Sequence, residues 1–176
     1  MGDFDDRAFN RPEPEEWSVS KEYRVWLADQ EGGEKHIDKK TGRWMPYPDD
    51  ADKWTIGRGH LINGGRSEKG FENGLTQAQV DKLFIEDIAK HTRAAQRIFR
   101  DKWDSMSQKQ RELAVDFTFN LGEKSRSEYP KMWGAVFRGD MATAASESGR
   151  NVEIGGKYYP AKKRNQGTLD YFFGKD

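Results

Sequence analysis

Apolar side chains recur at helical spacing near the start of the chain and predict its first long helix. Ser20 is a plausible N-cap, and Tyr23, Trp26 and Leu27 follow it at the spacing of one helix face. Gly32 and Gly33 come next, and paired glycines end helices because they tolerate backbone angles that other residues avoid. We therefore expect a helix from about residue 20 to residue 31.

A second apolar stripe predicts a much longer helix in the middle of the chain. Thr76 and Gln79 form a capping box, in which each side chain satisfies a backbone N–H at the helix start. An uninterrupted helix from there to Arg100 would span about 25 residues, or roughly 37 Å. Its apolar positions lie close to one stripe: Val80, Leu83, Phe84, Ile88, Ala95 and Ile98.

The last 70 residues predict several shorter helices. Ser107 and Gln110 form a second capping box, and Gly122 stops the helix that it opens. Further helices are expected over residues 130–137, from Asp140 onwards, and from about Pro160 to Phe173. The aromatic residues of this part are expected mainly in its core: Trp103, Phe117, Phe119, Trp133 and Phe137.

Between the two long helices, the sequence from Glu34 to Gly74 is rich in Gly, Pro and Asp and predicts a small β lobe. Trp54–Ile56 reads as a short strand, and turns are expected at Lys39–Gly42 and Asn63–Gly65. The order of elements predicts an α+β fold that is mostly helical, with two lobes joined by the long helix. One domain is expected over residues 20–176, preceded by an acidic arm, residues 1–19, that is flexible or docked.

Composition excludes several classes of function. Lysine plus arginine equal aspartate plus glutamate at 30 each, whereas a dedicated nucleic-acid-binding protein usually carries a basic excess. The chain has no cysteine, so disulfides and thiolate metal sites are excluded. Residues 1–20 contain no apolar run, so we expect neither a signal peptide nor a membrane anchor, and expect synthesis in the cytoplasm.

Carboxylates are the strongest candidates for chemistry. Glu31 ends a predicted helix, where the partial negative charge of the helix terminus favours the protonated carboxyl that a general acid needs. A glutamate before two glycines is also the ordinary sequence of a solvated helix end. Further carboxylates stand in the loop of residues 47–60, which lacks the spacing of a calcium loop, a phosphate-binding loop, a zinc site or a Gly-x-Ser-x-Gly nucleophile. Glycoside hydrolysis requires two carboxyl groups, and carboxylates from two separate segments can supply them.

These motifs together resemble the phage lysozyme family, glycoside hydrolase family 24. The similarity rests on Glu31–Gly32, on Tyr47-x-Asp49 followed by Thr55, and on the sequence Thr55–Ile56–Gly57-x-Gly59–His60. It continues through Gly74-x-Thr76, Lys82–Leu83–Phe84, Asp87, Phe119–Asn120–Leu121–Gly122 and the arginine- and aromatic-rich residues 164–174. It covers residues 20–174, with the motifs in the expected order.

The resemblance implies hydrolysis of the β-1,4 bond between N-acetylmuramic acid and N-acetylglucosamine in peptidoglycan, without a metal or other cofactor. Glu31 would be the acid, Asp49 the second carboxylate, and Thr55 the residue that helps to hold water. Asn120 and Gly59 would contact the sugar chain in a cleft between the lobes. Members of this kind invert the anomeric centre, which requires carboxyl groups roughly 6.5–9.5 Å apart.

The sequence departs from the family pattern between Glu31 and Asp49, where it carries an insertion that we place at Lys39–Gly42. This insertion leaves Asp38, Asp50 and Asp52 as competitors for the role of Asp49. An aspartate, Asp52, also replaces a common glycine, and Arg58 replaces a residue that is often apolar or Tyr.

His60 lies in the most specific motif, but we interpret it as a structural residue that braces the β lobe. By similarity to the family, its expected partner is Asp87 on the long helix.

The leading hypothesis is therefore a monomeric endolysin that stays in the host cytoplasm until the inner membrane is opened and then cuts peptidoglycan glycan strands. The alternatives are a lysozyme carried on the phage particle, a lytic transglycosylase, a chitin or chitosan hydrolase, and an inactive wall-binding module.

Overall fold

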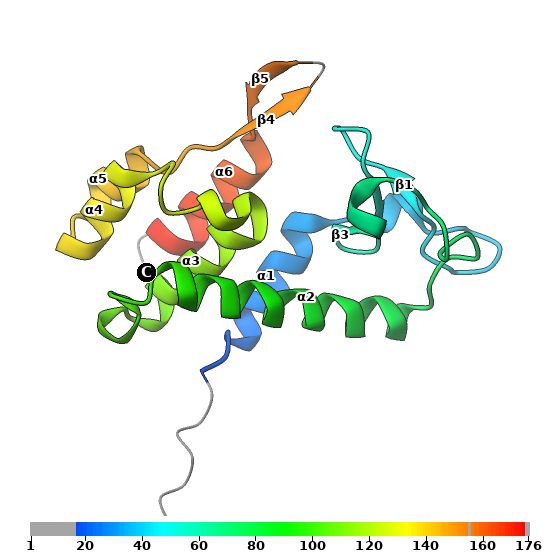
Figure 1. Cartoon of the computed structure of the whole chain (residues 1–176), viewed down its shortest axis with the longest axis horizontal. Helices are drawn as coiled ribbons and strands as arrows, with labels where there is room; N and C mark the ends of the chain where they lie inside the picture. Colours follow the sequence, from blue (N-terminus) through cyan, green and yellow to red (C-terminus); the bar gives the residue numbers. More distant parts are fainter. Residues whose placement is uncertain (1–16, 155, 175–176) are drawn as a thin grey trace, which may run out of the picture.

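The longest helix, α2 (Gln77–Ile98), runs along the molecule and joins a small β lobe to a larger helical lobe (Figure 1). The structure is a computed structural model that describes residues 17–154 and 156–174. The predicted capping box is present, since Thr76 Oγ1 accepts the N–H of Gln79 at 3.3 Å and Gln79 Oε1 accepts that of Thr76 at 2.8 Å. The helix ends before the predicted Arg100, because the chain turns at Phe99 and buries that ring in the core.

The β lobe contains the predicted strand Trp54–Ile56 as the centre of a three-stranded antiparallel sheet. Strand β1 (Tyr47–Pro48) and strand β3 (His60–Leu61) flank β2 (Trp54–Ile56), and short 3₁₀ turns, η2 (Glu34–His36) and η3 (Ile62–Gly65), complete the lobe. The register pairs Tyr47 with Thr55 and Ile56 with His60. This pairing places the residues of the most specific sequence motif on one small sheet.

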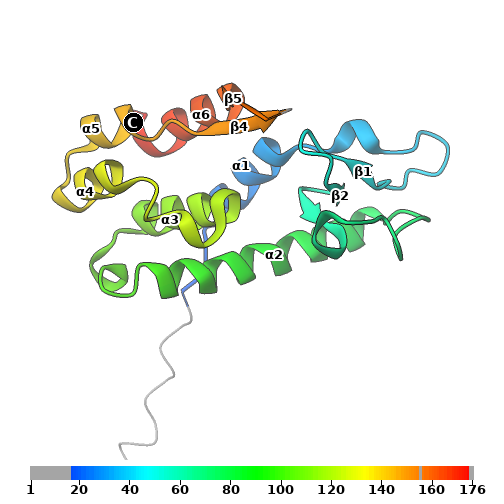
Figure 2. The same ribbon diagram turned by 45° about the horizontal axis from the view of Figure 1, so that its top comes forward.

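Helix α3 (Gln108–Leu121) is the central helix of the helical lobe. Its capping box forms as predicted, and Gly122 ends it with a positive φ of 64°. All seven residues from Glu112 to Thr118 are buried, so this helix is covered on every side. The elements around it are α1 (Lys21–Glu31), η4 (Trp103–Ser105), η5 (Gly122–Lys124), α4 (Pro130–Arg138), α5 (Met141–Ser146), α6 (Lys162–Thr168) and the π-turn η6 (Leu169–Phe173). Figure 2 shows α4, α5 and α6 on the side of α3 opposite to α2.

The last helix starts later than predicted, because a hairpin precedes it. Pro160 belongs to strand β5 (Lys157–Pro160), which pairs antiparallel with β4 (Asn151–Ile154), and α6 begins only at Lys162. The sequence signal for this hairpin is the Gly155–Gly156 pair between its strands, since Gly-Gly is typical of two-residue hairpin loops. The hairpin projects from the helical lobe beside the β lobe (Figure 1).

The end of the predicted acidic arm packs on the helical lobe. Val19 is buried, and the indole N–H of Trp17 donates to Gln108 Oε1 at 2.6 Å. The Trp17 ring meets Trp103 edge to face at 5.1 Å between centroids, which is a favourable aromatic geometry. The prediction made for residues 1–16 lies outside the described residues.

His60 and Asp87 connect the β lobe to the long helix. His60 Nδ1, on β3, lies 2.9 Å from Asp87 Oδ2, on α2, and the two side chains are 27% and 15% exposed. A partly buried pair of this kind destabilises the fold when either partner is removed alone, because the survivor loses its compensation.

We predict that His60→Ala and Asp87→Ala each lower the free energy of unfolding at neutral pH, and that the double variant loses less than the sum. The coupling in a double-mutant cycle should be about 1–3 kcal/mol. Activity per folded molecule should stay within about tenfold of wild type, because neither group transfers a proton in the reaction that the family resemblance implies.

The exposed pair Lys82–Glu86, 3.8 Å apart on the same helix, is the matched control and should couple by about 0.5 kcal/mol or less. Additive losses at His60 and Asp87 would contradict the structural role, and a stable but inactive His60→Ala variant would make His60 a catalytic candidate.

Candidate active site

Glu31 is the last residue of α1, and two glycines turn the chain sharply behind it. Gly32 and Gly33 have φ values of 62° and 98°, in the region that favours glycine. A Cβ atom on Gly33 would lie only 2.3 Å from the carbonyl oxygen of Gly57, in the turn between β2 and β3. This close backbone approach fixes the end of α1, and with it Glu31, against the β lobe.

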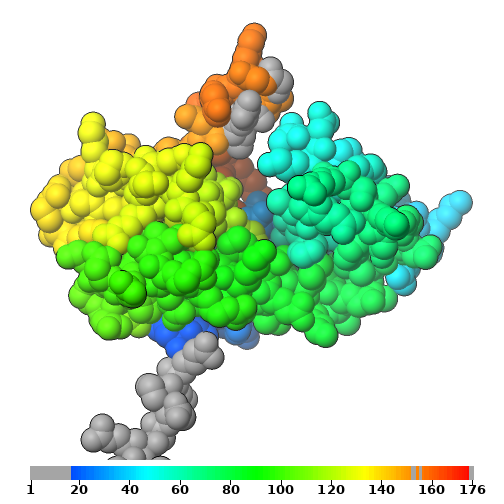
Figure 3. All heavy atoms as spheres, viewed as in Figure 1, coloured from blue at the N-terminus to red at the C-terminus, as the bar shows by residue number. Residues whose placement is uncertain are grey.

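The Glu31 carboxylate lies at the junction of the two lobes. Figure 3 shows a cleft between them, with atoms of α1 and α6 visible at its floor. The Glu31 side chain is 18% exposed and forms an ion pair with Arg164 Nη1 of α6. A Cβ atom on Gly59 would lie 2.8 Å from Glu31 Oε2, so the β2–β3 turn leaves no room for a side chain on this side. The half-buried, paired carboxylate differs from a solvated helix end.

Arg164 connects Glu31 to a second carboxylate in the core. Its Nη2 atom lies 2.5 Å from Asp116 Oδ1 on α3, and Asp116 Oδ2 lies 2.9 Å from Arg150 Nη1. The side chains of Asp116 and Arg150 have no exposed surface, and Arg150 also contacts the Thr168 hydroxyl. Four charges of alternating sign therefore form a line from the cleft into the helical lobe: Glu31, Arg164, Asp116 and Arg150.

The charges of Glu31 and Asp116, together with burial, shift the pKa values of the groups next to them. Burial alone would lower the pKa of Arg164, but the charges of Asp116 and Glu31 outweigh it and raise this pKa. Burial raises the pKa of Tyr23 well above its usual value, and the charge of Asp116 raises it further. Arg164 is therefore permanently charged and Tyr23 permanently neutral at the pH values at which proteins function.

Asp49 is held in the turn between β1 and β2. Its Oδ1 atom accepts the backbone N–H groups of Ala51 at 2.8 Å and Lys53 at 2.9 Å. Asp49 is partly buried, whereas its competitors Asp50 and Asp52 are exposed. The fourth candidate, Asp38, is partly buried and caps the Lys39–Gly42 turn, with its Oδ1 atom 2.8 Å from the N–H of Thr41. Of the four aspartates, Asp49 combines partial burial with a place on the same hairpin as Thr55.

Thr55 lies at the centre of β2, paired with Tyr47 on β1. It is buried, and its hydroxyl donates to the carbonyl oxygen of Lys53 at 3.1 Å. The Tyr47 ring stacks on His36 with centroids 3.6 Å apart. Burial raises the pKa of Tyr47, and the negative charges of Glu31 and Asp49 raise it further. Tyr47 is thus close enough to both candidate carboxylates to be affected by each.

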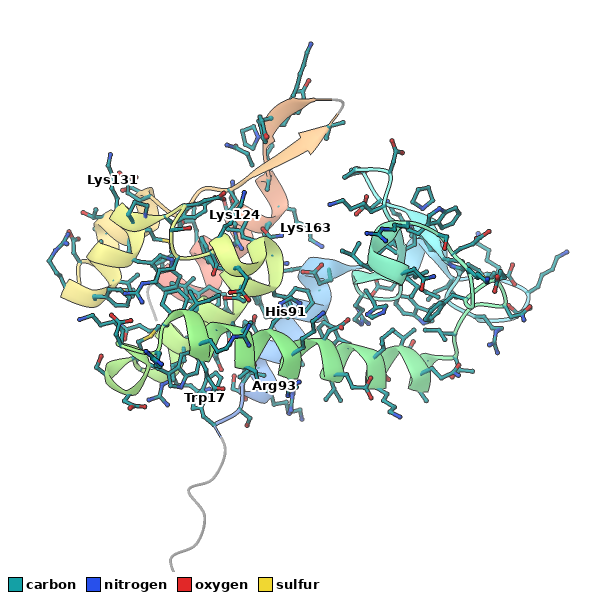
Figure 4. All side chains as sticks on the ribbon, viewed as in Figure 1. Trp17, His91, Arg93, Lys124, Lys131 and Lys163 are labelled. Carbon is teal, nitrogen blue, oxygen red and sulfur yellow. The ribbon has the colours of Figure 1, made fainter. Side chains whose placement is uncertain are left out.

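The remaining predicted site residues occupy different places. Gly59 borders Glu31, as described above, and Asn120 is exposed near the C-terminal end of α3. Lys163, labelled in Figure 4, lies next to Arg164 in sequence and donates to the carbonyl oxygen of Asp29 at 2.6 Å. This bond adds a positive charge to the C-terminal end of α1, which the helix dipole favours.

Arg150, Arg164 and Asp116 were not predicted as site residues. Arg164 was noted only as part of the arginine- and aromatic-rich residues 164–174, and no role was assigned to it. Asp116 carried a clearer one, since an acidic residue within the run Leu113–Phe117 must be buried if the run is buried. Arg150 stands in a Gly-Arg-Asn segment that gave no signal.

Two further observations concern metal ions and membranes. Within residues 17–154 and 156–174, no three His, Asp or Glu side chains converge in a way that could hold a metal ion. The helices of this part of the chain are all too short or too polar to cross a membrane.

A mostly helical, two-lobed fold with a carboxylate at the junction of the lobes defines a lysozyme-like protein. The sequence profile of the phage lysozyme family matches residues 39–166, which is most of the chain. The chain belongs to the phage lysozyme family, and it is a glycoside hydrolase that acts on peptidoglycan. The matched residues include Asp49, Thr55 and Arg164 but begin after Glu31.

Solved structures with the same fold include an endolysin and a muramidase domain. The endolysin from Escherichia coli O157:H7 phage FAHEc1 superposes with a TM-score of 0.66 at 18% identity, covering 89% of this chain and 93% of that one. The muramidase domain of SpmX from Asticaccaulis excentricus superposes with a TM-score of 0.62, also at 18% identity, covering 89% and 95%. A sequence search of curated proteins found no match.

We predict that Gly33→Ala destabilises the protein strongly and lowers its activity. The new methyl group would overlap the Gly57 carbonyl and push α1 away from the β lobe. The control is Gly42→Ala, which also has a positive φ, 68°, but no atom within 4 Å of the new Cβ. Gly42→Ala should cost only the backbone strain, about 1 kcal/mol, in chemical unfolding experiments. Equal losses at the two positions would contradict the close approach.

Proposed function

We propose that this chain is a lysozyme that hydrolyses the β-1,4 bond between N-acetylmuramic acid and N-acetylglucosamine, with Glu31 as the general acid. The observation that carries the proposal is the position of Glu31, a partly buried carboxylate between Gly59 of the β lobe and Arg164 of the helical lobe in a member of the phage lysozyme family. In the reaction, the protonated Glu31 would donate to the glycosidic oxygen as the bond to the anomeric carbon breaks.

Asp49 and Thr55 are the proposed partners on the opposite side of the sugar. The bonds that the structure describes for the Asp49 carboxylate involve Oδ1, and these bonds orient the whole group. Oδ2 is the atom that we assign to the nucleophilic water, with the Thr55 hydroxyl as a second contact for that water. The carboxylate would also stabilise the positive charge that develops on the sugar ring. Attack by water opposite to the leaving group inverts the anomeric centre, and proton NMR of the first product tests this outcome.

We further propose that the protein acts in phage-induced lysis, as a monomer made in the host cytoplasm that reaches the wall once the inner membrane is opened. Fractionation of producing cells before and after permeabilisation tests this location.

Mass spectrometry of digested peptidoglycan tests the bond. Reducing N-acetylmuramic acid ends support the proposal. Reducing N-acetylglucosamine ends, anhydro ends or the absence of products would overturn it in favour of a different glycosidase, a transglycosylase or an inactive module.

We predict that Glu31→Gln lowers the rate of wall lysis by about 10²–10⁴-fold, because an amide cannot supply the proton that general acid catalysis requires. The measurement is clearing of chloroform-treated Gram-negative cells by purified protein of equal folded concentration. The matched control is Glu34→Gln, three residues away, whose carboxylate binds the Arg58 side chain at 2.7 Å and is exposed. A Glu31→Gln variant that clears cells at nearly the wild-type rate would show that Glu31 is not the acid.

We predict that Asp49→Asn loses far more activity than Asp50→Asn or Asp52→Asn. Only Asp49 is tied into the β1–β2 turn by two backbone N–H groups, so only its carboxylate is held in a fixed orientation. The three variants differ by one oxygen-to-nitrogen exchange within four residues and serve as controls for one another. An active Asp49→Asn beside an inactive Asp52→Asn would shift the assignment to Asp52.

A further inference from the structure

The role proposed for Glu31 and its contact with Arg164 favour opposite protonation states of the carboxyl group. A general acid must carry a proton, yet an arginine within ion-pair distance favours the ionised carboxylate. If Arg164 had Glu31 as its one carboxylate partner, protonation of Glu31 would leave a nearly buried guanidinium without compensation, and such a state is strongly disfavoured. The structure holds a second carboxylate, Asp116, on the other side of the same guanidinium.

We infer that Asp116 is a positioning residue that allows Glu31 to hold its proton, by giving Arg164 a second and permanent carboxylate partner. The inference rests on the proposed role of Glu31 as the general acid. Arg164 uses Nη1 toward Glu31 and Nη2 toward Asp116, so its planar guanidinium serves both at once. When Glu31 is protonated, Arg164 keeps the bond to Asp116 at 2.5 Å and is not left unpaired.

Arg150 completes the arrangement from the inner side. Its Nη1 atom lies 2.9 Å from Asp116 Oδ2, and its guanidinium lies over the Phe117 ring at 4.3 Å from the centroid. The backbone N–H of Arg150 donates to Asn165 Oδ1 and its carbonyl accepts from Asn165 Nδ2, both at 2.9 Å. Asn165 follows Arg164 directly in α6, so these bonds hold Arg164 in register with Arg150. Asp116 thus binds one arginine with each of its two carboxylate oxygens.

The titratable and charged groups around Glu31 determine whether the pH profile reports on Glu31 itself, and they are Arg164, Tyr23, Tyr47, Asp49, Arg58 and Glu34. Burial raises the pKa values of Tyr23 and Tyr47 above 10. Burial would raise the pKa of Glu34, but a backbone hydrogen bond and Arg58 outweigh it and lower this pKa below 4.5. None of these three titrates between pH 5 and 9, Arg164 stays charged, and Asp49 and Arg58 are present in every variant compared below. His36, stacked on Tyr47, is present in every variant compared below, so its titration is common to all.

The test compares Asp116→Asn and the double variant Asp116→Asn/Arg150→Gln with wild type. The single variant leaves Arg150 buried without a carboxylate and is expected to be less stable, whereas the double variant removes one charge of each sign and restores the balance. In both, Arg164 keeps Glu31 as its carboxylate partner within the ion pairs described. The alkaline limb of the kcat/KM profile should therefore move to lower pH by about one unit, which is about tenfold less activity at any pH on that limb.

A structural role alone gives a different result, because the double variant would then recover the wild-type profile together with its stability. Asp101→Asn is the matched control, since it breaks an exposed pair with Arg126 in the same lobe and should leave the profile unchanged. A double variant that is folded and has the wild-type profile overturns the inference.

A second measurement separates this inference from the proposed function. Carbon-13 NMR follows the Glu31 carboxyl directly, and the resonance is assigned by its absence in Glu31→Gln. We expect its titration midpoint to fall in the double variant, and an unchanged midpoint overturns the inference. If instead Glu31→Gln keeps its activity, the proposed role of Glu31 fails, whatever the NMR titration shows.

Discussion

A carboxylate buried in the centre of the helical lobe constrains the arrangement of the last third of the chain. Asp116 has no exposed surface, and a buried charge without compensation would cost several kcal/mol. Its partners, Arg150 and Arg164, come from residues 34 and 48 positions further along the sequence. The segment before β4 and the helix α6 must therefore both lie against α3, and the hairpin β4–β5 between them is carried to the edge of the lobe.

The same constraint connects the core of the helical lobe to the cleft. Arg164 reaches Glu31 only because α6 lies beside the end of α1, where Lys163 Nζ donates to the carbonyl oxygen of Asp29 at 2.6 Å. On the opposite side, the contact between Gly33 and Gly57 holds the end of α1 against the β lobe. Glu31 is thus fixed from both lobes at once, by an ion pair on one side and by a backbone approach on the other.

This arrangement explains how one carboxylate can be both anchored and protonated in the proposed reaction. An isolated Glu31–Arg164 pair would orient the Glu31 carboxylate but would favour its ionised form. A Glu31 without Arg164 would hold its proton more readily but would lack a fixed orientation. Because Arg164 also binds Asp116, it favours the ionised form of Glu31 less strongly. It still orients the Glu31 side chain. Tyr23, neutral and buried next to both carboxylates, adds no charge to this balance.

Local signals in the sequence determined most of the secondary structure and one part of the site. Both capping boxes, the Ser20 cap and the glycines after α1 and α3 depend on residues within a few positions of each other, so they were predictable. The position of Glu31 at a helix end, and of Asp49 and Thr55 in one turn and strand, follows from the same short-range rules. The β4–β5 hairpin was missed although its Gly-Gly loop stands in the sequence, and Pro160, which was assigned to the last helix, ends its second strand.

What only the tertiary structure decided is the set of charges that surround Glu31. Asp116, Arg150 and Arg164 lie far apart in the sequence, and no periodicity or spacing relates residues whose contact depends on how three helices pack. The sequence therefore placed Glu31 at a helix end, and the family resemblance assigned it to the cleft. The fold decided which arginine binds it and which second carboxylate shares that arginine, because burial, which forces charges to pair, exists only once the chain is packed.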